Sequence, residues 1–294
     1  MTKPSRRPAT FTCFDEMPPH LVEEGGARTW LARAANFVIA FSRVTDGAVL
    51  KRGDNPDEYT VYLPNSKCTI AAGGESIEAT PDSLTIVPPG RSRITVHGEG
   101  SVVRVFSSRA ADLAVLSANR EVYADGAADV APLEAWPEPT GGYRLRSYRV
   151  SEYTRSGSNM RVFRSTSLML NFLVKRETPR DVRKLSPHSH ADFEQGSFAI
   201  GGSYIHHCRY PWTPDMTGWR DDEHVEVGSP SVMVVPPTIV HTSQNVGSEP
   251  GWMIDVFAPP RVDFSLRPGV VCNADDYPMP ALPANALAPA AEAA

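Results

Sequence analysis

Short apolar runs rich in β-branched and aromatic residues recur along both halves of the chain, and each ends near a glycine, proline or asparagine. They cover residues 60–64, 84–89 and 102–108 in the first half, and residues 160–163, 168–174, 198–207, 232–237 and 253–259 in the second. Residues 109–125 have the period of an amphipathic helix, with Leu113 and Leu116 on one side. The pattern predicts an all-β protein with one helix near the middle.

The two halves repeat each other. Residues 83–89 (SLTIVPP) match residues 231–237 (SVMVVPP), and a Val-Phe pair follows each copy, at Val105-Phe106 and Val256-Phe257. A duplicated all-β unit explains this spacing, because the period is too long for a solenoid.

The repeat also sets the expected boundaries. We expect a first barrel with its trailing helix over residues 9–125, an Ala/Gly/Pro-rich linker over 126–143 and a second barrel over 144–278. Residues 1–8 and the Ala/Pro-rich tail 279–294 lack periodicity, and we expect both to be disordered.

Six of the eight histidines fall between positions 188 and 241. His188 and His190 share one face of an extended chain, and Glu194 keeps the same parity. His241 follows the second Pro-Pro pair and completes a set of three imidazoles and one carboxylate. Such a set suits Fe(II), Mn(II), Co(II), Ni(II) or Zn(II), and a six-coordinate ion would keep two positions open for substrate, water or dioxygen.

These residues resemble the two motifs of the cupin superfamily. The first motif, HxH(x)3–4E(x)6G, is matched by His188, His190, Glu194 and Gly201. The second, PxG(x)2H(x)3N, is matched by Pro236, His241 and Asn245, with Thr238 in place of the glycine. The resemblance implies two tandem cupin barrels (double-stranded β-helix or jelly-roll folds), with one metal in the second barrel and Asn245 beside it.

The first repeat departs from the motifs. Aligned on the Pro-Pro pairs, Arg93 stands opposite His241, and Glu58 is the best counterpart of the carboxylate. Because a guanidinium cannot ligate a metal, we expect a metal-free barrel that serves as scaffold or dimer surface. The alternative is an anion site at Arg91 or Arg93.

Gly201-Gly202 suggests a two-residue hairpin turn. In that register Phe198, His207 and Arg209 face the metal: His207 to move a proton, Arg209 and Phe198 to bind substrate together with Asn245. A one-residue register shift would instead turn His206 inward. The following segment, residues 211–228, carries Trp212 and Trp219 and is either a lid or a packing element.

Composition limits the partners. The formal net charge of −5 and the lack of a long basic run argue against nucleic-acid binding. Four widely spaced cysteines, and the lack of an apolar stretch long enough for a leader or a membrane span, predict a cytoplasmic protein with reduced thiols. An exposed sheet edge would favour a homodimer.

Three functions remain open at this point. The main hypothesis, from the resemblance to cupin dioxygenases, is a non-heme Fe(II) dioxygenase that cleaves a small aromatic or dicarbonyl substrate with O2. The alternative is a non-redox Mn, Zn or Ni enzyme (lyase, decarboxylase, isomerase or C–N hydrolase) acting on a small carboxylate or sugar acid. The third is a metal-free ligand-binding cupin.

Overall fold

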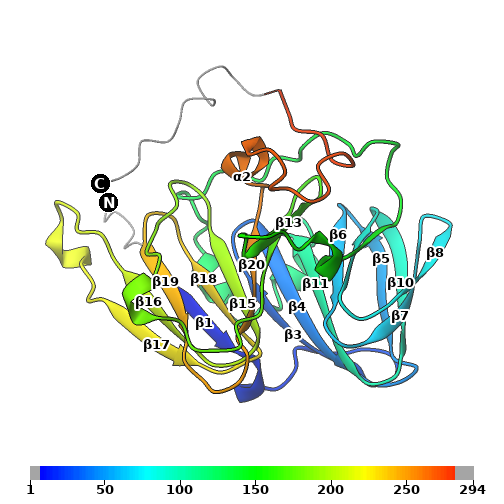
Figure 1. Cartoon of the computed structure of the whole chain (residues 1–294), viewed down its shortest axis with the longest axis horizontal. Helices are drawn as coiled ribbons and strands as arrows, with labels where there is room; N and C mark the ends of the chain where they lie inside the picture. Colours follow the sequence, from blue (N-terminus) through cyan, green and yellow to red (C-terminus); the bar gives the residue numbers. More distant parts are fainter. Residues whose placement is uncertain (1–6, 282–294) are drawn as a thin grey trace.

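Two β-barrels lie side by side, each made from one large and one small antiparallel sheet (Figure 1). The computed structural model describes residues 7–281. A seven-stranded and a four-stranded sheet form the first barrel, and a six-stranded and a three-stranded sheet form the second. The predicted all-β fold is confirmed.

The first barrel contains β2 (Leu21–Val22), β3 (Arg28–Arg33), β4 (Phe37–Val44), β5 (Val49–Asn55), β6 (Tyr59–Leu63), β7 (Lys67–Ala72), β8 (Glu75–Ala79), β9 (Ser83–Val87), β10 (Gly90–His97) and β11 (Gly100–Ser107). The second contains β13 (Met160–Arg164), β14 (Met169–Leu173), β15 (Gln195–Gly201), β16 (Tyr204–Arg209), β17 (Glu223–Val227), β18 (Ser231–Val235), β19 (Val240–Asn245) and β20 (Trp252–Phe257).

Each barrel takes one edge strand from the segment that precedes the other barrel. β1 (Thr10–Cys13) pairs with β18 in the second barrel, and β12 (Arg146–Arg149) pairs with β9 in the first. Figure 1 shows the blue strand β1 among the yellow and orange strands of the second half. The predicted division at 9–125 and 144–278 therefore misplaces both strands.

The predicted helix over 109–125 is divided. The structure has a short helix α1 (Ala111–Ala114) and a separate 3-10 turn η2 (Arg120–Tyr123). A second short helix, α2 (Val262–Leu266), follows the last strand. The other 3-10 turns are η1 (Phe14–Glu16), η3 (Val150–Tyr153), η4 (Val182–Lys184) and η5 (Met216–Gly218).

The two large sheets pack against each other and form the main hydrophobic core. Side chains alternate along a strand, so one face of each large sheet enters this core while the other lines its own barrel. On β11, Val103 and Val105 face the neighbouring barrel, whereas Val102 and Phe106 face the interior of the first. This double burial explains why these strands are continuous apolar runs.

Large side chains fill the interior of the first barrel. Arg104 lies on the interior face of β11 and forms an ion pair with Glu23 at 2.7 Å, while Tyr59 stacks on Phe106 at 4.7 Å. Arg104 also stands, in the repeat, where Asp255 stands in the second barrel. A guanidinium therefore occupies, in the first barrel, the position of a carboxylate in the second.

The residues aligned with the metal motif in the first repeat have other roles. Arg93 is exposed and lies 3.7 Å from Glu24, and the neighbouring Ser92 points inward to the Tyr59 hydroxyl at 2.8 Å. Glu58 is fully buried and accepts hydrogen bonds from Thr166 and Tyr277 of the second half. Glu58 therefore joins the two halves of the chain.

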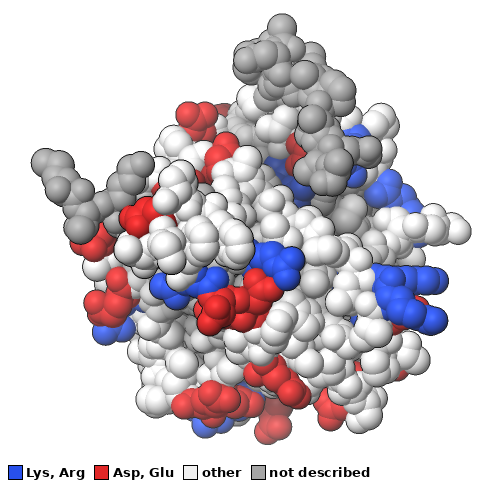
Figure 2. All heavy atoms as spheres, turned by 90° about the vertical axis from the view of Figure 1, so that its left-hand side faces the viewer, with Lys and Arg blue, Asp and Glu red and all other residues white. Residues whose placement is uncertain are grey.

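The ends and the surface add three observations. Residues 1–6 and 282–294, which make up most of the segments expected to be disordered, lie outside the described residues. Within the described residues, no helix is both long and apolar enough to cross a bilayer. On the face in Figure 2, basic and acidic side chains are interspersed, without a continuous basic surface.

Candidate metal centre

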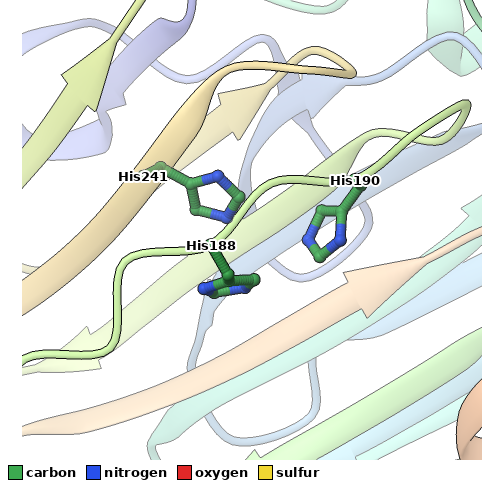
Figure 3. Close-up of side chains that lie close together, drawn as sticks. All are labelled: His188, His190 and His241. Carbon is green, nitrogen blue, oxygen red and sulfur yellow. The ribbon is translucent and has the colours of Figure 1, made fainter. Parts of the chain in front are cut away.

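Three histidines from two segments converge at one end of the second barrel (Figure 3). His188 and His190 lie in the loop before β15, and His241 lies on β19. A backbone bridge joins His188 to His241, with N–H···O distances of 3.1 and 2.8 Å. One ring nitrogen from each histidine lies within 4.8 Å of the others. The three histidines named from the sequence spacing therefore lie close together, and their binding of a metal stays a prediction.

The hydrogen bonds of two of the rings, those of His188 and His241, leave the Nε2 lone pair free for a metal. Nδ1 of His188 donates to the Ser186 carbonyl, and Nδ1 of His241 donates to the Ile239 carbonyl, both at 3.0 Å. Because a carbonyl only accepts, each Nδ1 carries the proton and Nε2 carries the lone pair. Nε2 of His241 is buried and has no partner among the described residues.

Burial also keeps two of the rings neutral. Desolvation lowers the pKa of His190 to about 3 and the pKa of His241 to about 4. Metal binding requires neutral imidazoles, so these rings are ready to ligate at neutral pH. The donor set fits a divalent transition metal.

Glu194 does not face the cluster, contrary to the sequence prediction. Its carboxylate points toward the first barrel and accepts hydrogen bonds from the Ala35 amide at 2.5 Å and the Tyr123 hydroxyl at 3.1 Å. Arg7 from the N-terminal segment forms an ion pair with it at 2.5 Å. Glu194 is 2% exposed, and its oxygens are already engaged. The residue is therefore part of the contact between the barrels.

Gln195, the next residue, faces the histidines instead. Its Oε1 lies 2.9 Å from Nε2 of His190. This is a hydrogen-bond distance, and because an amide oxygen only accepts, Nε2 of His190 is the donor. An ion bound by both atoms would replace this proton, since two ligands at right angles with bonds of about 2.1 Å also lie about 3 Å apart. Sequence reasoning missed Gln195, although the motif HxH(x)3–4E allows the longer spacing that ends at this position.

The orientation of the Gln195 amide is fixed by its other end. Nε2 donates to the Ser197 hydroxyl at 2.9 Å and to Asp255 at 3.2 Å, and the Ser197 hydroxyl donates to Asp255 at 3.0 Å. These acceptors require the nitrogen, so the amide oxygen must face His190. Ser197 and Asp255 are thus positioning residues for the fourth candidate ligand.

Replacing Gln195 by leucine is expected to weaken metal affinity by about 10- to 100-fold, because leucine has a similar volume but no ligand oxygen. Gln195→Glu keeps an oxygen and is expected to retain the metal. Titration of the metal-free protein with Mn²⁺, followed by electron paramagnetic resonance, measures both. An unchanged affinity in Gln195→Leu would remove Gln195 from the ligand set.

Thr238 holds the loop that carries the ligands. Its backbone N–H donates to the His190 carbonyl at 2.6 Å, and its φ is 69°. This is the position at which the cupin motif has glycine, the residue that adopts positive φ most easily. This positive φ explains why the motif has glycine at this position, and Thr238 adopts it despite its β-branched side chain.

A cavity of about 460 Å³ opens beside the histidines. The side chains of His188, His241 and Gln195 line one part of it, and Asp255 lies on the barrel wall. Burial raises the pKa of Asp255 to about 6. Three arginines also line the cavity, namely Arg176, Arg180 and Arg261. The cavity therefore combines a metal cluster with groups that attract an anion.

The predicted hairpin at Gly201-Gly202 is wrong, and three residue predictions change with it. β15 and β16 belong to different sheets, so the glycines form a corner between them. Phe198 packs in the core between the barrels, with Phe41 at 6.0 Å. His207 faces outward and contacts His224 at 2.7 Å, and the exposed Arg209 pairs with Asp222 at 2.7 Å.

His206, the residue that the alternative register turned inward, is buried on β16, although the hairpin itself is absent. Its Nδ1 lies 2.8 Å from the Ser243 hydroxyl. Asn245 lines the cavity, and its place beside a metal stays a prediction. In the outlying loop around η5 (Figure 1), Trp212 and Trp219 stack on each other at 4.4 Å, and neither is among the residues that line the cavity.

Comparisons with known proteins identify the fold. No family model matches the chain, and no curated protein matches it in sequence. Protein YlbA from E. coli, of the family DUF861, has a TM-score of 0.61 at 13% identity, covering 87% of this chain and 92% of that one. Oxalate decarboxylase from Bacillus subtilis, in a structure concerned with its Mn(II) centres, has a TM-score of 0.57 at 15% identity, covering 91% and 83%.

A third solved structure agrees with these two. Oxalate decarboxylase from Lactobacillus farciminis, solved as a formate complex, has a TM-score of 0.57 at 13% identity, covering 85% of this chain and 86% of that one. At such identities the likeness concerns the fold alone. The chain has the all-β cupin fold that its sequence motifs indicated.

Proposed function

We propose that the protein is a metal-dependent enzyme that performs non-redox chemistry, as a lyase, decarboxylase or hydrolase, on a small carboxylic acid. One observation carries the proposal: three imidazoles converge beside the Gln195 amide, and two of them, His188 and His241, line a cavity that arginines also line. This narrows the alternative that the sequence left open beside the dioxygenase, which also included an isomerase and sugar acids.

A divalent ion held by His188, His190, Gln195 and His241 would act as a Lewis acid that polarises a substrate oxygen. The wall of the cavity supplies the anion-binding groups. Arg180 donates to the Ser243 carbonyl at 3.1 Å and to the Ser186 hydroxyl at 2.8 Å, which fixes its guanidinium in place.

Arg261 is held in a similar way. Its guanidinium stacks over Phe264 at 3.7 Å and donates to Asp263 at 2.7 Å. Fixed guanidinium groups bind a carboxylate with little loss of side-chain entropy. Together these residues would orient a small acid with one end toward the ligands.

The names of the similar structures favour a decarboxylase over a dioxygenase. Two of the three are oxalate decarboxylases, and one of these is described with Mn(II) centres. Mn(II) is accordingly the first metal to test, before Fe(II), Zn(II) and Ni(II). The dioxygenase interpretation has no comparable support, and the assay includes it as the competing outcome.

The test begins with protein purified without chelator and analysed for metal. Samples loaded with each metal are then incubated with small mono- and dicarboxylic acids and their amides, and release of CO2 or ammonia is measured beside O2 uptake. We expect about one metal ion per chain and turnover without O2 uptake. Iron-dependent O2 uptake with catechols or diketones would overturn the proposal in favour of a dioxygenase.

A further inference from the structure

Two buried carboxamides among the residues that line the cavity each have an oxygen without a partner in the described part of the chain. Asn245 is 2% exposed, and its Nδ2 donates to the Thr178 carbonyl at 2.9 Å. This bond fixes the amide, so Oδ1 is the atom left without a partner among the described residues. Asn245 and His241 both lie on β19, and both line the cavity.

Asn171, on strand β14, is a second asparagine of this kind. It is 3% exposed and lies directly across from Asp255 in the sheet, with a side-chain hydrogen bond that stabilises the Asp255 carboxylate. A carboxylate accepts hydrogen bonds, so the Asn171 nitrogen is the group engaged. Its Oδ1 also lacks a partner within the described part of the chain.

The position of Asn245 is supported by packing as well as by its hydrogen bond. A side chain at Gly251 would meet the Tyr204 hydroxyl at 2.9 Å and Cβ of Asn245 at 3.0 Å. The absence of a side chain at Gly251 therefore lets Tyr204 and Asn245 come close to this part of the wall. Both of these side chains line the cavity.

Amide oxygens that are buried in a folded protein are nearly always hydrogen-bonded, so two free ones in one cavity call for a donor from outside the chain. A dicarboxylate without an N–H or O–H group brings only acceptors. These would face the two amide oxygens and the Asp255 carboxylate with no hydrogen between them. A primary amide or amine brings two N–H hydrogens, one for each oxygen, whereas a hydroxyl brings only one. The arginines already provide for the carboxylate of the same molecule.

We infer that the substrate is a small carboxylic acid that also carries an N–H group, such as an amide or an amine, and that this group donates to Asn245 Oδ1 and Asn171 Oδ1. The inference rests on the proposed function, since it names the substrate class of the same cavity. The carboxylate lies toward the arginines, and the nitrogen lies toward the two asparagines.

The test compares acids that differ only by replacement of CH3 with NH2 at equal charge: pyruvate with oxamate, acetoacetate with malonamate, and levulinate with succinamate. Binding to Mn²⁺-loaded protein is measured by calorimetry after the metal content has been determined. We expect the amide of the best-fitting pair to bind at least about tenfold more tightly, which is about 1.4 kcal/mol.

Variants assign the preference to the asparagines. Asn245→Leu and, separately, Asn171→Leu are each expected to reduce the preference for the amide by up to about tenfold. Asn159→Leu, a change at an exposed residue of the same cavity, is expected to keep the preference. The comparison in the unaltered protein remains decisive if a variant fails to fold.

The outcomes separate the two claims. Protein that binds no metal would overturn the proposed function. Protein that binds metal but takes amide and ketone equally in every pair, or takes none of these acids, would overturn the inference about the N–H group while leaving the metal centre in place.

Discussion

Replacing His241 by alanine is expected to lower metal affinity by at least about 100-fold and to abolish turnover, while the barrels stay folded. His241 provides a buried Nε2 with no partner among the described residues, so the site loses a ligand that nothing nearby replaces. Metal analysis after dialysis and Mn²⁺ titration measure the loss. Circular dichroism reports whether the sheets are retained.

His207→Ala is the matched control for this variant. His207 lies across from Thr242 on the neighbouring strand, one residue after His241, but its ring points outward to His224. We expect its metal content to equal that of the unaltered protein. Full metal occupancy in His241→Ala, or a loss of metal in His207→Ala, would show that the cluster has been assigned wrongly.

The histidine cluster could be predicted from sequence on two grounds, a local alternation for two of the histidines and a repeated motif for the third. Alternation along an extended chain places His188 and His190 on one face, and the Pro-Pro repeat marks the strand that carries His241. The fourth candidate ligand could not be fixed in this way. Between His190 and β15 the chain bends, so parity no longer decides whether Glu194 or Gln195 turns inward.

Tertiary contacts settle that choice. The Glu194 carboxylate finds donors on the first barrel and on the N-terminal segment, and Gln195 finds Ser197 and Asp255 inside the second barrel. None of these partners is adjacent in sequence to the ligand loop except Ser197. A pattern read along one segment carries no information about them.

The same limit applies to the strands. The repeat predicted two barrels, but the exchange of β1 and β12 depends on pairing between distant segments. At Gly201-Gly202 the residue types suit a tight hairpin, yet β16 pairs with β17 and β19. A hairpin and a corner between sheets both need glycine, so local composition does not distinguish them.

Arg7→Ala is expected to destabilise the metal-free protein by about 3 kcal/mol, because it leaves the buried Glu194 carboxylate without its cation. The Arg7 guanidinium is held between Glu194 and Asp129 and stacks on the Tyr123 ring at 5.1 Å. Urea unfolding with chelator present measures the loss. A change below about 1 kcal/mol would mean that the ion pair is replaced by water, as at exposed sites.

The double variant Arg7→Met/Glu194→Gln separates the ion pair from packing. It removes both charges together, so we expect it to be more stable than the sum of the two single effects predicts, by about 1–3 kcal/mol.

The same variants test the ligand assignment. Glu194→Gln is expected to keep its metal, because the carboxylate faces Ala35 and Tyr123 and not the histidines. If Glu194→Gln loses its metal at unchanged stability, Glu194 rather than Gln195 is the ligand. If Glu194→Gln keeps its metal and unfolds more easily, Glu194 stabilises the contact between the barrels. Metal binding and barrel contact then depend on two neighbouring residues of one short loop, Gln195 and Glu194.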